Sequence, residues 1–211
     1  CYISVGGVKL MAEVIKVIGK NAFVQVFEST RGMRVGDEAE FEGHMLEVTL
    51  GPGMLSRNYD GLQNDLDKME GVFLRRGEYT FPLDNDKLWD FKPLAKVGDK
   101  VAAGGWLGEV DENFQPHKIM VPFTFKGEYT VKSLKEAGQY TIGEVIAVLT
   151  DETGKDVEVT MIQRWPVKRA ITCYKEKPRP YKLLETGVRT IDTVNPIVEG
   201  GTGFIPGPFG T

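Results

Sequence analysis

A chain of 211 residues, 41% of them hydrophobic, has room for one large domain or two small ones and can bury substantial cores. Its net charge of −4 and pI near 5.4 argue against a general binder of nucleic acid or anionic membranes, because both need a basic surface. Cys1 and Cys173 are the only cysteines, which excludes a disulfide framework and a thiolate zinc cage, and His44 and His117 are too few for multi-histidine sites. No apolar run reaches the roughly 20 residues that span a bilayer. No signal-peptide pattern opens the chain, so we expect a soluble, cytosolic protein.

Residues 1–49 predict a small β-barrel or sandwich, and we favour the barrel. The runs LMAEVIKVIG and AFVQVFES are apolar and β-branched, and a short turn at Lys20–Asn21 joins them as a hairpin. Shorter strand-like runs follow, with breaks at Gly36–Asp37 and Gly43. Because Cys1 already lies within a strand pattern, we expect the barrel to lack its first strands and the chain to be a piece of a longer protein.

Residues 50–75 predict a connector. Gly51–Pro52–Gly53 breaks the preceding strand. Leu55, Tyr59, Leu62 and Leu66 then recur at helix-like spacing, which predicts one short helix.

Residues 76–161 return to strands and turns. The segments KVGDKVAAGGWLGEV (Lys96–Val110) and AGQYTIGEVIAVL (Ala137–Leu149) each contain an apolar strand, a glycine turn and a second apolar strand. Such a repeat predicts two interlocking β halves.

The two halves resemble those of lipoyl and biotinyl carrier domains. A carrier needs its modified lysine at the tip of a tight hairpin, and Lys118 in QPHKIMVP is the candidate. The residues that flank Lys118 do not match a carrier motif, and a shared fold does not imply a shared function. We therefore favour a shared fold alone and keep a carrier or interaction module as the alternative.

The basic run Arg164–Lys182 interleaves aromatic side chains with lysines and arginines, a composition that can hold single-stranded nucleic acid. Its three prolines make it extended, and the rest of the chain is acidic. We predict a solvated linker at the start of a section that spans residues 162–211, and no binding of nucleic acid.

The chain shows no catalytic constellation. Asp111 and Glu112 adjoin in a turn, and Asp84–Asn85–Asp86 lacks the glycine and the distant glutamate of a calcium loop. No G-x-S-x-G motif is present. We expect neither catalytic residues nor a metal site within these 211 residues.

The chain closes with GGTGFIPGPFGT. A phosphate-binding loop has the form G-x-x-x-x-G-K-[ST], in which backbone N–H groups surround phosphate oxygens. Gly207, Pro208, Phe209, Gly210 and Thr211 supply the first glycine and the four positions after it. These residues alone leave open whether the segment is a phosphate loop or an ordinary glycine–proline turn.

A longer match favours the phosphate loop. TGVRTIDTVNPIVEGGTGFIPGPFG (Thr186–Gly210) closely resembles the stretch before the phosphate loop in the catalytic A subunit of V-type and archaeal-type rotary ATPases. LEVTLGPGMLSRNYDGLQ, HKIMVP and QRWPVKR resemble further motifs of that family, in the same order. The chain departs from the family pattern at Asn64–Asp65, where Arg-Pro is common, and at Asn195, which indicates a divergent bacterial branch.

The resemblance implies a mainly β chain: a partial β-barrel, a connector, an inserted lipoyl-like barrel-sandwich "bulge" domain and the first segment of a RecA-like α/β domain. It also implies MgATP as the cofactor of the intact subunit and Gly207–Thr211 as ATP-binding residues. The implied partners are B subunits in an alternating hexamer, a central stalk and a peripheral stalk. The implied location is the cytoplasm, at the inner face of a membrane, and contact with the membrane is made only through a separate membrane-embedded sector. We expect this chain alone to bind ATP negligibly and to hydrolyse none. A non-catalytic B subunit is the remaining alternative; the inserted domain and the IPGPFG segment argue against it.

Overall fold

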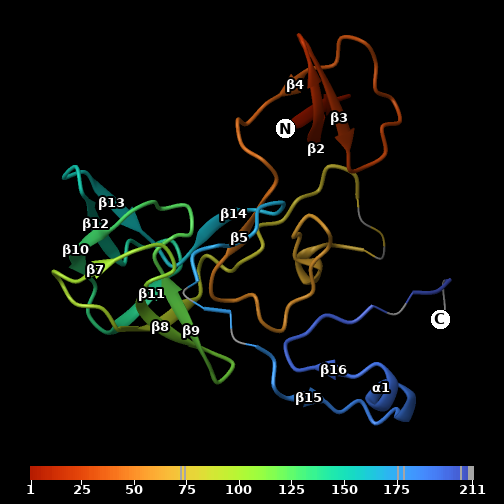
Figure 1. The fold of residues 1–211 in the computed structure, drawn as a ribbon. Helices are drawn as coiled ribbons and strands as arrows, with labels where there is room; N and C mark the ends of the chain where they lie inside the picture. The colour runs from red at the N-terminus through yellow and green to blue at the C-terminus, as the bar shows by residue number, and fades with distance from the viewer. Residues whose placement is uncertain (72, 74, 175, 178, 205, 209–211) are drawn as a thin grey trace. The chain divides into compact units, whose positions relative to one another are not determined.

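The computed structural model describes residues 1–211 except 72, 74, 175, 178, 205 and 209–211 (Figure 1). Contacts divide the chain into two units, Cys1–Cys173 and Tyr174–Thr211. The expectation of a mainly β chain is confirmed, because strands far outnumber the single short α-helix found among the described residues. Those residues do not show the α/β nucleotide-binding fold expected at the C-terminal end.

The N-terminal sheet has four strands in the order β3-β2-β1-β4. They are β1 (Tyr2–Val5), β2 (Val8–Ile18), β3 (Asn21–Val26) and β4 (Ala39–Glu40). Alternation along β2 buries Leu10 and Ala12. The β2–β3 hairpin is present, but its turn is Gly19–Lys20 rather than Lys20–Asn21, since Ile18 pairs with Asn21. Gly19 takes φ +58°, a conformation that glycine adopts without steric cost.

The connector does not contain the helix that the apolar spacing predicts. Among the described residues of this connector, only a 3₁₀ turn, Leu66–Lys68, is present. The Asp60 carboxylate accepts hydrogen bonds from the backbone N–H groups of Leu62 and Asn64, at 2.9 and 2.8 Å, and Gln63 takes φ +64°. Because this side chain bonds the backbone in a non-helical conformation, it competes with a helix over these residues.

The middle of the chain forms two four-stranded sheets, ordered β13-β12-β10-β7 and β11-β6-β8-β9. The strands are β6 (Leu88–Pro93), β7 (Lys100–Val101), β8 (Trp106–Glu112), β9 (Gln115–Met120), β10 (Tyr129–Leu134), β11 (Gly138–Thr141), β12 (Ala147–Asp151) and β13 (Asp156–Val159). The first repeat supplies β7 and β8, and the second supplies β11 and β12. Each repeat therefore gives one strand to each sheet, which confirms the prediction of interlocking halves.

Two clusters of buried apolar side chains stabilise these sheets. One gathers around Phe91 and Ile142, and the other around Leu107 and Leu149, all of them at most 1% exposed. Phe91 also makes an edge-to-face contact with Tyr140.

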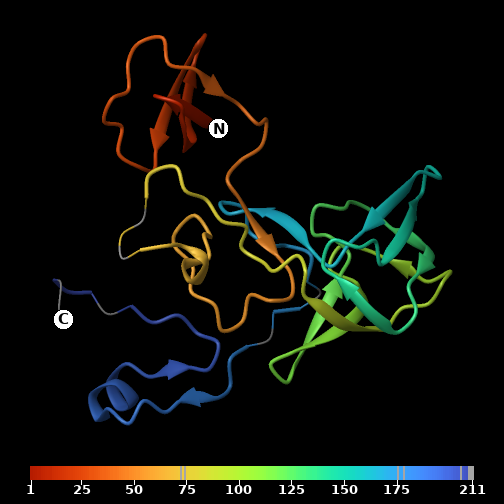
Figure 2. The ribbon, with the colours of Figure 1, turned by 180° about the vertical axis from the view of Figure 1, so that it is seen from behind.

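A two-stranded ribbon joins residues far apart in sequence. β5 (Glu47–Leu50) pairs antiparallel with β14 (Gln163–Pro166), and both views show the two strands side by side (Figures 1 and 2). Trp165 in β14 is 9% exposed and packs edge-to-face on Phe123. The first residues of the basic run are therefore a strand with a buried tryptophan, and the prediction of a solvated linker is wrong for them.

The second unit contains β15 (Leu183–Leu184), α1 (Arg189–Val194) and β16 (Ile197–Val198). β15 pairs antiparallel with β16, and α1 lies between them in sequence. Lys182 and Glu199 form an ion pair at 2.8 Å at the end of this ribbon.

Candidate functional site

The predicted ATP-binding residues lie at the end of the second unit. Gly207 and Pro208 are exposed. Phe209, Gly210 and Thr211 lie outside the described residues. The segment that leads into these residues lies within the described part of the chain.

That segment contains a hydrogen-bonded loop within TGVRTID. The Asp192 carboxylate accepts hydrogen bonds from the Thr186 hydroxyl (2.6 Å), the Thr186 N–H (3.1 Å) and the Gly187 N–H (3.0 Å). These hydrogen bonds hold the pKa of Asp192 below its usual value, and the bond from the Thr186 hydroxyl contributes most. The family motif thus has a local physical basis: its aspartate folds the preceding threonine and glycine back onto α1.

The end of α1 turns the chain toward the glycine-rich segment. Asn195 N–H donates to Ile191 O at 3.0 Å, and Pro196 follows, which cannot continue a helix. After β16, Gly201 lies so close to Val198 that a Cβ atom there would be 2.8 Å from a Val198 methyl carbon. These contacts constrain the chain up to the start of GGTGFIPGP.

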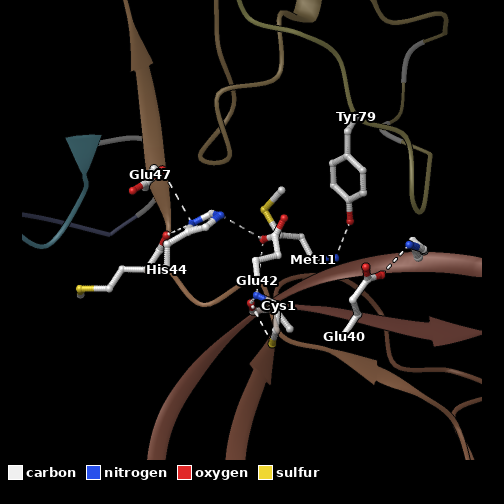
Figure 3. Close-up of polar contacts among 10 residues, drawn as sticks. Cys1, Met11, Glu40, Glu42, His44, Glu47 and Tyr79 are labelled. Carbon is white, nitrogen blue, oxygen red and sulfur yellow. Dashed lines mark hydrogen bonds and ion pairs between the residues drawn. The ribbon is translucent and has the colours of Figure 1, made fainter. Parts of the chain in front are cut away.

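The N-terminal sheet and the segments around the connector border a cavity of about 590 Å³, and Figure 3 shows some of the residues that line it. Tyr79 lies on its wall: its hydroxyl donates to the Glu28 carboxylate and accepts from the Met11 N–H at 2.6 Å. Burial, together with the hydrogen bond to Glu28, raises the pKa of Tyr79 above its usual value. Because the hydroxyl is held on both sides, it fastens the sheet to the segment after the connector and is poorly suited to proton transfer.

Gly77 completes this attachment. Its N–H donates to the second Glu28 oxygen at 2.7 Å, and its backbone lies directly on Val8, where a Cβ atom would be 2.2 Å from a methyl carbon. On the other side of the cavity, His44 lies between Glu42 and Glu47 (Figure 3). Its Nε2 atom is 3.9 Å from Glu42 Oε2, and its Nδ1 atom is 3.7 Å from Glu47 Oε2. No cluster of three or more histidine, cysteine, aspartate or glutamate side chains in the described part of the chain could hold a metal ion.

A buried carboxylate joins the connector to the middle domain. Glu112 is 3% exposed and accepts hydrogen bonds from the N–H groups of Gly53 (2.7 Å) and Leu55 (2.9 Å). Its other oxygen lies 2.7 Å from His117 Nδ1. Sequence reasoning placed Glu112 in a polar turn. The alternation Val110, Asp111, Glu112 along β8 was the signal that its side chain points inward.

Lys118 does not occupy the position that a carrier lysine needs. It lies within β9, four residues after Phe114, the second residue of the hairpin turn Asn113–Phe114. Its ammonium forms an ion pair with Glu109, which lowers the pKa of Glu109, and lies 4.9 Å from the centre of the Trp106 ring. The geometric requirement of the carrier hypothesis is contradicted.

Two stretches of the chain match known domain families. Residues 1–43 match the "ATP synthase alpha/beta family, beta-barrel domain", and residues 80–168 match the "ATPsynthase alpha/beta subunit barrel-sandwich domain". The chain belongs to the ATP synthase alpha/beta family.

Within that family, the chain is a homologue of V-type ATP synthase alpha chains. It is 48% identical to the V-type ATP synthase alpha chain of Treponema denticola, and 47% identical to alpha chain 1 of Treponema pallidum and to the alpha chain of Borrelia garinii subsp. bavariensis. Each match covers 99% of this chain but only 36–37% of the relative. The chain thus spans little more than a third of the length of these curated relatives. None of the described helices is long and apolar enough to cross a membrane.

Proposed function

We propose that this chain is the N-terminal part of the catalytic subunit of a rotary ATP synthase or ATPase, which couples ATP synthesis or hydrolysis to the transport of protons or sodium ions. The observation that carries the proposal is the match to V-type ATP synthase alpha chains over 99% of the chain. In this proposal the domains are residues 1–49, 50–75, 76–161 and 162–211.

In the proposed site, Gly207–Thr211 begin the phosphate-binding loop for MgATP. Backbone N–H groups of Phe209, Gly210 and Thr211 would face phosphate oxygens, and Pro208 would restrict the loop. The Asp192 loop and Gly201 support this role, because hydrogen bonds and close packing order the chain between Thr186 and Gly201, just before the proposed phosphate loop. Positioning and charge stabilisation supply most of the catalysis in phosphoryl transfer, so a fixed entry to the loop matters.

The proposed assembly is a ring that alternates this subunit with a related non-catalytic subunit, joined to a central and a peripheral stalk. The ring lies at the cytoplasmic face of the membrane and touches it through a separate embedded sector. In this arrangement the N-terminal sheet holds neighbouring subunits together and the middle domain faces outward.

The test is nucleotide binding measured by calorimetry on two proteins: the 211-residue chain and the full-length subunit. We expect micromolar binding of MgATP by the full-length subunit and none by the 211-residue chain. In the full-length subunit, Gly207→Val should abolish binding, whereas Gly143→Val, at an open turn where no atom would meet a new Cβ, should leave it unchanged. Full-length subunit that binds no nucleotide would refute the proposal; tight binding by the short chain would refute its assignment as an incomplete site.

A further inference from the structure

Backbone strain gathers at the tip of the β8–β9 hairpin. In the described part of the chain, four non-glycine residues take positive φ, and three of them meet here: Ser56 (62°), Asn113 (54°) and Phe114 (64°). Glu112 pairs with Gln115, so Asn113 and Phe114 form a two-residue turn with both φ values positive. Glycine is strongly preferred at the second position of such a turn, where this chain has a bulky phenylalanine.

Phe114 gains no burial that would offset this strain. Its side chain is 96% exposed, and Leu55, next to Ser56 in the connector, is 48% exposed. A polar residue or glycine would make the same turn without placing an aromatic ring in water. Strained backbone that the local packing does not require is typical of binding sites.

The tip is held rigidly from two sides. Asn113 Nδ2 donates to the Ser56 hydroxyl at 3.1 Å, and Phe114 N–H donates to the Asp111 carboxylate at 2.9 Å. One residue earlier, the buried Glu112 carboxylate binds the Gly53 and Leu55 N–H groups. An aromatic side chain on a rigid support loses little conformational entropy on binding, which is the property of an interface anchor.

The charge beside the tip indicates the chemistry of the partner. Asp111 is exposed and has no ion-pair partner among the residues that the structure describes. A surface that receives Phe114 would therefore be an apolar pocket with a lysine or arginine at its rim.

We propose that Leu55, Ser56, Asn113 and Phe114 form a docking knob for another polypeptide of the same complex, which presents an apolar pocket with a cationic rim. The inference rests on the proposed function in one respect only, namely that the full-length chain works within an assembly. It names the contact residues on the middle domain, which the proposed function leaves undefined.

The first experiment places the photo-crosslinking residue p-benzoylphenylalanine at position 114 of the full-length subunit in its purified native complex. Mass spectrometry then identifies the crosslinked peptide. We expect a peptide from a different polypeptide, with apolar residues beside a lysine or arginine. Crosslinks only within the same chain, or none, would overturn the proposal.

The second experiment separates binding from folding. Phe114→Gly relieves the strained turn, so the thermal midpoint of the 211-residue chain should rise by about 2–4 °C, while the assembled complex should lose its crosslinked partner at least tenfold faster on dilution. Val35→Gly, which removes an equally exposed apolar side chain elsewhere, is the control and should leave dissociation unchanged. An unchanged dissociation rate for Phe114→Gly overturns the inference. If instead the wild-type complex assembles but neither binds nor hydrolyses ATP, the proposed function fails and the knob can still be judged from the crosslink.

Discussion

At the scale of single residues, Gly108 shows how closely the strands of the middle domain approach one another. A Cβ atom at this position would lie 2.2 and 2.4 Å from two carbons of the Phe91 ring and 2.8 Å from Lys92 O. Phe91 is 1% exposed at the centre of its core cluster and cannot move aside easily.

We expect Gly108→Ala to lower the free energy of unfolding by about 1–3 kcal/mol, the usual cost of overpacking a core. Urea denaturation of the 211-residue chain measures this change in the free energy of unfolding. Gly143→Ala, where the new methyl group meets no atom within 4 Å, should stay within roughly 0.5 kcal/mol of the parent. Equal effects of the two substitutions would contradict this account of Gly108.

Asp192 gives a prediction of pH dependence. Its folded-state pKa lies below the ordinary value of 3.8, so the stabilisation of the TGVRTID loop is complete above that ordinary value and is lost as the pH falls through the lower, folded-state pKa. NMR should show the Gly187 amide signal constant from pH 7 to pH 5 and moving only below about pH 4. In Asp192→Asn the signal should be shifted already at pH 7 and should not titrate. Titration of the parent signal above pH 4.5 would contradict the contacts of Asp192.

At the scale of elements, the β5–β14 ribbon depends on Trp165. Its indole packs on Phe123 with ring centres 5.7 Å apart, and its Nε1–H donates to Arg169 O at 2.8 Å. The ribbon is only four residue pairs long, so this side chain supplies much of the apolar burial that holds it.

Trp165→Ala should destabilise the 211-residue chain by about 3–5 kcal/mol. Hydrogen exchange should rise over residues 47–50 and 163–166 while β8 and β12 stay protected. Trp106→Ala is the matched control. Because Trp106 is 57% exposed, this substitution should lower the free energy of unfolding far less. If exchange rises equally throughout the middle domain, the ribbon is not a separate element.

Sequence patterns predicted strands well and the connector poorly, for physical reasons. Alternation and glycine turns in Lys96–Val110 and Ala137–Leu149 reflect local needs of a strand, and the two-sheet arrangement followed from their repetition. The apolar spacing of Leu55–Leu66 failed because Asp60 bonds the backbone of its own loop. The contacts of Glu112 and Tyr79 join residues 51 to 68 positions apart, and no local pattern reports such pairs.

At the scale of the whole molecule, the middle domain is predicted to serve assembly rather than nucleotide binding. Deleting residues 76–161 from the full-length subunit should spare ATP binding and impair assembly or coupling. The structure sharpens this test, because that deletion also removes Gly77 and Tyr79, which fasten the N-terminal sheet.

A second deletion, of residues 84–161, keeps both fastening residues and isolates the role of the middle domain. We expect calorimetry to show the same ATP affinity in both variants and native gels to show impaired assembly in both. Loss of ATP binding in the second deletion would assign the middle domain a direct role in the nucleotide site.

The pairing of Leu50 with Gln163 has a consequence for how such a protein can change over time. The polypeptide leaves this ribbon and returns to it at neighbouring points, so the part of the intervening chain that follows Gly77 and Tyr79, which fasten the N-terminal sheet, can be exchanged as a cassette without redirecting the chain on either side. A foreign domain whose own termini lie close together could be grafted there in one step. In evolution, a single insertion or deletion in the gene at this junction could likewise add a domain to the protein or remove one.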